Sequence, residues 1–113
     1  MTTDYIPKRG DVVWISLNPQ SGHEQAGERP VLVLSPSAYN EKVGLAIICP
    51  MTNQIKGYPF EVKIPSQCDL SGAILSDQAK SLDWKARKAE YLCTLPENTI
   101  SEVLGKLCTL IRA

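Results

Sequence analysis

Apolar residues along this chain fall into short runs separated by polar turns, which is the pattern of a protein built mainly from strands. The run from Asp11 to Leu17 is rich in β-branched and aromatic residues and predicts a strand. A second strand is predicted from Pro30 to about Ser35. Four consecutive apolar residues at 31–34 indicate burial on both faces, and Pro36 is expected to end this strand or to place it at an edge.

The middle of the chain continues the same pattern. Strands are predicted at 45–49, 60–64, 73–79 and 88–93, with a polar turn at 52–59 and a short helical turn at 81–86. Pro50 is expected to stop the first of these strands, because proline gives no backbone N–H to a sheet.

The last part of the chain has helical periodicity instead. The spacing Thr94-x-x-Glu97 predicts a capping box, with Pro96 inside the first turn. Apolar residues then recur every three or four positions, which predicts a helix with one buried face. They are Ile100, Val103, Leu104, Leu107 and Ile111, whereas Leu110 lies off this face and can serve a second contact such as a dimer interface. Short strands and one terminal helix predict a mainly β fold, a small antiparallel barrel with a C-terminal α-helix packed on it.

Composition and charge narrow the class of protein. At 113 residues, the chain is predicted to form one domain, 1–113, with its own core. Its apolar runs are too short for a membrane span, and no secretory signal is recognisable at 1–9, so we expect a cytoplasmic protein. Lys and Arg, 12 in all, balance 12 Asp and Glu, which argues against nucleic-acid binding by bulk charge. The basic residues of 80–88 can still form either a local groove or a solvated face.

The four cysteines do not have the spacing of a metal site. Cys49, Cys68, Cys93 and Cys108 are far apart, without a Cys-x-x-Cys pair, and the chain has one histidine. We therefore expect reduced, partly buried thiols, and neither a metal nor another cofactor.

A long polar loop between the first two predicted strands is the strongest candidate for a functional site. Residues 18–30 are far more than a simple hairpin turn needs. Glu24 offers a proton acceptor and Arg29 a fixed cation. Taken alone, the same two residues can equally be a weak, solvated ion pair.

The residues of this loop, and others in the same order along the chain, resemble the MazF/PemK (Kid) family of toxin endoribonucleases. The motif Asn18-Pro-x-x-Gly22-x-Glu24-Gln25-x-Gly27-x-Arg29-Pro30 carries much of the likeness. The remaining matches are Trp14, Tyr39-Asn40, Pro50-x-Thr52, 56–60 (Lys-Gly-Tyr-Pro-Phe), 76–78 (Ser-Asp-Gln) and 85–87 (Lys-Ala-Arg). The first two-thirds are most similar to the MazF branch, and the helix beginning at Pro96 is more similar to the PemK branch.

The resemblance implies an SH3-like barrel of MazF/CcdB type that forms a homodimer. It also implies a toxin that cuts single-stranded RNA, chiefly messenger RNA, at short sequences without a metal. In such a reaction the ribose 2′-hydroxyl attacks the neighbouring phosphate and leaves 2′,3′-cyclic phosphate and 5′-hydroxyl ends. The expected partners are therefore the RNA substrate, a second copy of the chain and a cognate MazE-like antitoxin, with no membrane and no DNA contact by the toxin alone.

The resemblance also assigns catalytic roles. Glu24 and Arg29 are given the acid–base work and Thr52 a stabilising role, although which group is base and which is acid stays open. Arg29 also suits a phosphate on physical grounds, because its planar fork holds two oxygens at once. PemK-type accounts use an arginine and an aspartate on a later strand, but here Leu75 occupies the arginine's position, which leaves Asp77 to position a base or brace the site.

Further residues are candidates for RNA binding. Trp14 either stacks on an unpaired base or belongs to the core, and Tyr58 is the better stacking candidate because its surroundings are polar. His23 is either a polar contact or a proton-transfer group. The other candidates are Gln25, Asn40 and Gln78, whose amides can read base edges, Asp77, and the cations Lys56, Lys80 and Arg87.

Two other functions fit this sequence less well than the nuclease. A CcdB-like toxin binds DNA gyrase on the same kind of barrel, but depends on a Trp-Gly-Ile ending where this sequence has Leu110-Ile-Arg-Ala. A barrel that only binds RNA or an antitoxin would leave the set Glu24, Arg29 and Thr52 without a purpose.

Overall fold

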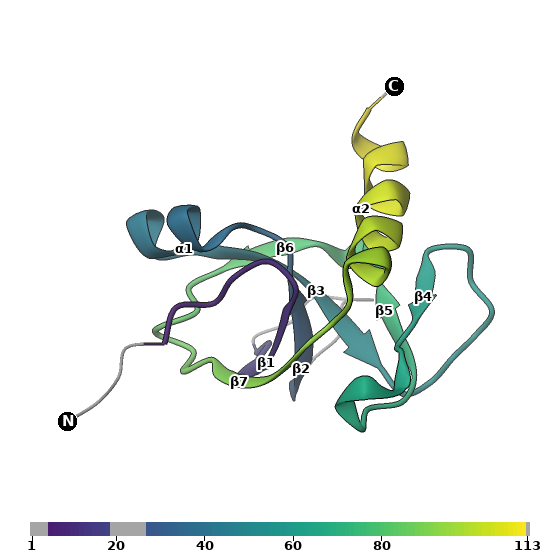
Figure 1. The fold of residues 1–113 in the computed structure, drawn as a ribbon, viewed down its shortest axis with the longest axis horizontal. Coiled ribbons are helices and arrows are strands. Elements are labelled where there is room, and N and C mark those ends of the chain that lie inside the picture. The colour runs from purple at the N-terminus through teal and green to yellow at the C-terminus, as the bar shows by residue number, and fades with distance from the viewer. Residues whose placement is uncertain (1–4, 19–26, 113) are drawn as a thin grey trace.

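The computed structural model describes residues 5–18 and 27–112, and within them the chain forms a single antiparallel sheet with helices beside it (Figure 1). Its strands follow the order β4-β5-β3-β2-β1-β7, and β6 pairs with β3 off this path. Their bounds are β1 Asp11–Ser16, β2 Glu28–Val33, β3 Ala46–Thr52, β4 Glu61–Lys63, β5 Ala73–Leu75, β6 Lys80–Leu82 and β7 Glu90–Thr94. The predicted mainly antiparallel β fold with a C-terminal helix is confirmed.

Strand β3 continues through Pro50, so the prediction that this proline ends the strand is wrong. On one side β3 pairs with β2, where Pro50 lies opposite Val31. On the other side it pairs first with β6, through residues 46–48, and then with β5, through residues 51–52. Pro50 lies at the gap between these two partners, where a strand needs no N–H donor, and this explains how a central strand accommodates it.

The core has two apolar clusters, and neighbouring residues of one strand contribute to different clusters. Leu32 and Leu34 of the first cluster alternate with Val31 and Val33 of the second, as side chains on a strand do. The expected burial of residues 31–34 on both faces is therefore confirmed. The first cluster also includes Val103 of α2 (Glu97–Ile111), which fixes this helix against the sheet.

A short helix, α1 (Ser37–Val43), follows β2 and was not predicted. It begins after Pro36 and ends at Gly44, whose φ of 83° is the left-handed conformation typical of a helix C-terminus. Within α1 only Asn40 is buried, so the segment lacks the apolar stripe by which a helix is recognised in a sequence.

The beginning of α2 differs from the prediction. Thr94 belongs to β7, and its hydroxyl donates to Oδ1 of Asp11, so it does not cap the helix. Pro96 precedes the first turn, without a side-chain cap. Ile100 and Val103 are buried as expected, but Ile111 is 71% exposed because the last turns extend beyond the sheet (Figure 1). Neither α1 nor α2, the α-helices of the described residues, is long and apolar enough to cross a membrane.

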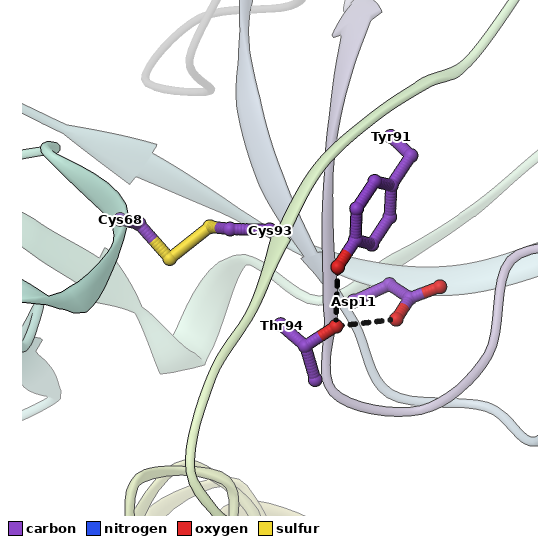
Figure 2. The surroundings of a disulfide bond; sticks show 5 residues. All are labelled: Asp11, Cys68, Tyr91, Cys93 and Thr94. Carbon is purple, nitrogen blue, oxygen red and sulfur yellow. Dashed lines mark hydrogen bonds between the residues drawn. A yellow bond between two sulfur atoms is a disulfide. The ribbon is translucent and has the colours of Figure 1, made fainter.

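Two of the four cysteines form a disulfide, which corrects the expectation of reduced thiols. Cys68, at the end of the 3-10 helix η1 (Ser66–Cys68), is bonded to Cys93 of β7, with 5.8 Å between their Cα atoms (Figure 2). The two residues are 25 positions apart, and only the packing of η1 against β7 brings them together. Cys49 is buried and free, and Cys108 is exposed and free.

Candidate functional site

The ends of the three central strands and one loop form a pocket of about 370 Å³ that contains two of the three predicted catalytic residues. Arg29 comes from β2 and Thr52 from the last position of β3. Trp14, predicted to contact RNA, comes from β1. The other residues around it are Glu28, Pro30, Met51, Asn53 and the loop segment Asp69, Leu70 and Ser71.

Strand pairing places Arg29 next to Thr52. Val31 of β2 lies opposite Pro50 of β3. Because the two strands are antiparallel, Arg29, two residues before Val31, and Thr52, two residues after Pro50, lie toward the same end of the pair. The half-buried guanidinium donates a 3.0 Å hydrogen bond from Nη1 to the carbonyl oxygen of Met51. This bond holds a cation at the pocket with its position fixed by the backbone of the neighbouring strand.

Trp14 is 37% exposed and forms part of the pocket wall. Its indole Nε1 donates to Oε1 of Glu28 over 3.1 Å, which holds the ring on the surface of the sheet. The alternative that Trp14 belongs to the core is therefore wrong. A fixed, accessible indole face is suited to stacking on an unpaired base.

Thr52 lines the pocket and is buried, with 8% of its surface exposed. Its Oγ1 accepts a 3.1 Å hydrogen bond from the backbone N–H of Gln54, and that bond does not use the hydroxyl proton. Gly72, just before β5, packs closely against the backbone of Thr52. A Cβ atom at Gly72 would lie 1.9 Å from the Thr52 carbonyl oxygen, and its φ of +114° is unfavourable for any other residue.

Lys56, Tyr58 and Asp77 lie outside the lining of this pocket, and Tyr58 contacts Asp77. Lys56 and Tyr58 are exposed on the loop 53–60, between β3 and β4. The Tyr58 hydroxyl donates to Oδ2 of Asp77, in the 3-10 helix η2 (Ser76–Gln78). This hydrogen bond, followed by desolvation and the nearby negative charges, raises the pKa of Tyr58, so its hydroxyl stays protonated and donates. The role of Asp77 in positioning a base or bracing the site stays a prediction.

Two predicted RNA-binding residues form hydrogen bonds to the protein's own backbone. Asn40 is 0% exposed, and its amide donates to the carbonyls of Pro7 and Ser35 and accepts from the Ser35 hydroxyl. No part of this amide is exposed to read a base, so the structure contradicts that role, and Asn40 instead links α1 to the segments that contain Pro7 and Ser35. Arg87 donates from Nη1 to the carbonyls of Ser16 and Asn18, which fixes the end of β1 where the long loop begins.

Of the remaining candidates, the structure describes Gln78 and Lys80. Gln78 ends η2, and Lys80 begins β6, where both are half-buried and interact with other groups. Glu24, His23 and Gln25 lie outside the described residues. Within residues 5–18 and 27–112, no three His, Cys, Asp or Glu side chains are grouped so that they could hold a metal ion.

Sequence reasoning missed two parts of the pocket wall. Glu28 immediately precedes Arg29 in β2. Its hydrogen bond with Trp14 follows from the diagonal positions of Trp14 and Glu28 on the paired strands β1 and β2. Asp69 adopts a left-handed conformation, φ 54°, directly after the disulfide residue Cys68. Nothing in the sequence indicated that residues 69–71 reach the pocket, because the disulfide and Gly72 bring them there.

Comparison with known proteins decides the family. Residues 8–111 match the family described as the PemK-like, MazF-like toxin of type II toxin-antitoxin systems. The chain is 42% identical over 111 residues to the endoribonuclease toxin MazF of Escherichia coli K12, covering 98% of this chain and 99% of that one. It is 36% identical to the Escherichia coli endoribonuclease PemK, covering 92% of this chain and 81% of PemK. The chain belongs to the MazF/PemK family of endoribonuclease toxins.

Solved structures of MazF agree with this membership. The crystal structure of MazF (Form-I) from Deinococcus radiodurans superposes with a TM-score of 0.94 at 50% identity, covering 97% of this chain and 100% of that one. A MazE–MazF complex (Form-II) from the same organism gives a TM-score of 0.85 at 45% identity, covering 96% of this chain and 98% of that chain. The recognition made from the sequence motifs is therefore confirmed, including the greater similarity to MazF than to PemK.

Proposed function

We propose that this MazF/PemK-family chain is a metal-independent endoribonuclease that cuts single-stranded RNA, chiefly messenger RNA, at a short sequence. The observation that carries the proposal is the pocket itself, in which Trp14, Arg29 and Thr52 from three neighbouring strands face the same space. The indole of Trp14 can stack on an unpaired base, while the cation of Arg29 and the hydroxyl of Thr52 can stabilise negative charge on a phosphate.

The proposed reaction is attack by the ribose 2′-hydroxyl on the adjacent phosphorus. The P–O bond to the 5′-oxygen then breaks, which gives a 2′,3′-cyclic phosphate and a 5′-hydroxyl end. Arg29 stabilises the charge that accumulates on the phosphate oxygens, and Thr52 donates a hydrogen bond to the same centre. Glu24 is the proposed acceptor of the 2′-hydroxyl proton, and the acid–base work that it shares with Arg29 returns a proton to the departing 5′-oxygen. Positioned acid–base groups of this kind contribute about 10²–10⁴-fold.

The same protein is proposed to act as a homodimer and to be neutralised by a MazE-like antitoxin. Leu110 and Ile111, which are 52% and 71% exposed at the end of α2, support a second contact in the dimer. The Deinococcus radiodurans MazF structures that resemble this chain include complexes with MazE. An antitoxin that occupies the pocket would explain neutralisation, since RNA could not then reach Arg29.

The test is purified, antitoxin-free protein incubated with a long messenger RNA in excess EDTA, with both new ends mapped. Discrete cuts with cyclic-phosphate and 5′-hydroxyl ends are expected. An intact RNA, from protein shown by circular dichroism to be folded, would contradict the proposal and favour a barrel that only binds its partners. Cuts that disappear in EDTA would contradict the metal-independent chemistry alone.

A further inference from the structure

The loop 53–60 has no regular secondary structure, yet its backbone is held by a single carboxylate. Glu61 accepts hydrogen bonds from three consecutive backbone N–H groups: Lys56 at 3.1 Å, Gly57 at 3.1 Å and Tyr58 at 3.4 Å. Gly57 has a φ of 75°, a conformation that turns successive N–H groups toward one centre. Both carboxylate oxygens of Glu61 are thereby used inside the loop.

Helix α2 holds the other side of this loop. Lys106 donates from Nζ to the carbonyl of Pro59 over 2.7 Å and to the carbonyl of Glu61 over 2.9 Å. The same ammonium group lies 3.7 Å from Glu102, one turn earlier on the helix. Contacts between α2 and β4 place the helix beside the strand in which Glu61 lies (Figure 1). The loop is therefore connected to the element farthest from it in sequence.

Lys56 and Tyr58 are two of the exposed side chains of the loop, although the loop's backbone is fixed. Tyr58 is 44% exposed and is held through its hydroxyl by Asp77 and by an edge contact with Phe60, with ring centroids 5.9 Å apart. Lys56 is also exposed. An aromatic ring and a cation held in fixed positions on a surface can select bases without first losing conformational entropy.

We infer that Glu61 and Lys106 are positioning residues that fix the loop 53–60 as a sequence-reading element of the enzyme, a role that rests on the proposed function. A carboxylate near bound RNA repels phosphate, so its presence here calls for a structural reason. The three backbone hydrogen bonds that Glu61 accepts provide that reason, because they fix the loop. Because both of its oxygens accept backbone hydrogen bonds, Glu61 is assigned a structural role in the loop and no part in proton transfer.

The variants for the test are Glu61→Gln and Lys106→Met, which keep side-chain size. A glutamine has one acceptor oxygen, so its amide NH₂ faces N–H groups and at least one of the three bonds is lost. Glu102→Gln is the matched control, because Glu102 lies on α2 and pairs with Lys106, which is the residue that contacts the loop. The first readout is trypsin cleavage after Lys56, which reports the order of the loop without any need for RNA.

The second readout is the distribution of cut sites on one long RNA, with kcat and KM on a short RNA that contains the preferred sequence. Glu61→Gln and Lys106→Met should be cut faster by trypsin after Lys56 and should use a broader set of RNA sites. KM should rise roughly 10-fold while kcat changes less than about 2-fold, because the loop binds substrate and does not react. Glu102→Gln should match the wild type in trypsin cleavage, in cut-site distribution and in kcat and KM.

The outcomes separate the two proposals. Unchanged trypsin cleavage, or faster trypsin cleavage with an unchanged cut-site distribution and KM, would overturn the inference while leaving the nuclease assignment intact. A fall in kcat alone would also overturn it, since Glu61 would then act in the chemistry. A wild-type protein that cuts no RNA, yet shows the expected trypsin pattern, would overturn the proposed function and with it the reading role of the loop.

Discussion

Nη1 of Arg29 donates a hydrogen bond to the carbonyl oxygen of Met51, the residue immediately before Thr52. One catalytic candidate therefore supports the strand that positions the other. Removing Arg29 has two consequences, one for the chemistry and one for the packing, and they can be measured separately.

Arg29→Ala should lower kcat on RNA roughly 10²–10³-fold, because a fixed donor to the phosphate is lost. It should also lower the free energy of unfolding by about 1 kcal/mol, the usual loss for one hydrogen bond. Arg9→Ala is the matched control, since Arg9 also donates to a backbone carbonyl, that of Leu34 at 2.6 Å, outside the pocket. It should lose comparable stability and keep its activity. Near-normal cleavage by Arg29→Ala would contradict the catalytic assignment.

Reducing the disulfide between Cys68 and Cys93 should destabilise the protein by about 2–4 kcal/mol, because the link restricts the unfolded chain across 25 positions. The measurement is urea unfolding with and without a phosphine reductant. A Cys68→Ser, Cys93→Ser double variant should show the lower stability already and should not respond to the reductant. Equal midpoints for the oxidised and reduced wild type would show that the link contributes nothing.

Replacement of Gly72 by alanine should damage both stability and activity. The new Cβ would collide with the Thr52 carbonyl, and a φ of +114° is strained for alanine, so a loss above about 1 kcal/mol is expected. Cleavage should fall with it, because Thr52 must move. Gly105→Ala in α2 is the contrast, since nothing lies within 4 Å of its Cβ position, and it should gain about 0.5–1 kcal/mol. Thermal unfolding and kcat of both variants test this pair.

The two free cysteines should react very differently. Burial, with a smaller effect of Asp77, raises the pKa of the Cys49 thiol to about 12. Iodoacetamide at pH 8 should therefore modify Cys108 alone in the folded protein, as peptide mass spectrometry would show. Cys108→Ser should leave the native protein unmodified. A prompt adduct at Cys49 would mean that the core opens on the time scale of the labelling.

The raised pKa of the Cys49 thiol also makes the stability of the protein depend on pH. A raised pKa in the folded state favours the neutral thiol, so the contribution of Cys49 to stability is fully present below its ordinary pKa of 9.0. That contribution is lost as the pH rises from there toward 12. Cys49→Ala should flatten this part of the curve of stability against pH.

Periodicity in the sequence predicted most of the strands and α2, because alternating or three-to-four spacing follows directly from which side chains are buried. It failed where another contact decides the structure. Helix α1 depends on one buried amide, that of Asn40, rather than on an apolar stripe. The strand continues through Pro50 because its partners change there, and no local pattern records a change of partner.

The candidate site was predictable only in part for the same reason. Arg29 and Thr52 were found because the sequence resembles a family, and strand pairing then explains their proximity. Asn40 belongs to the same motifs, yet its burial shows that a matching residue can serve the fold instead of the RNA. Asp69 and its neighbours were missed because a disulfide and a close backbone contact bring them to the pocket, and both depend on the complete fold.

The pairing of β1 with β7 joins Asp11 to Thr94, across most of the chain, whereas β1 and β2 are neighbours in sequence. Contacts between such distant positions slow folding, because a large loop must close before they form. A chain growing on a ribosome can form the β1–β2 hairpin long before β7 exists. One edge of β1 then stays without its partner until β7 has emerged, so this endoribonuclease toxin cannot complete its sheet while the early part of its own coding sequence is being translated.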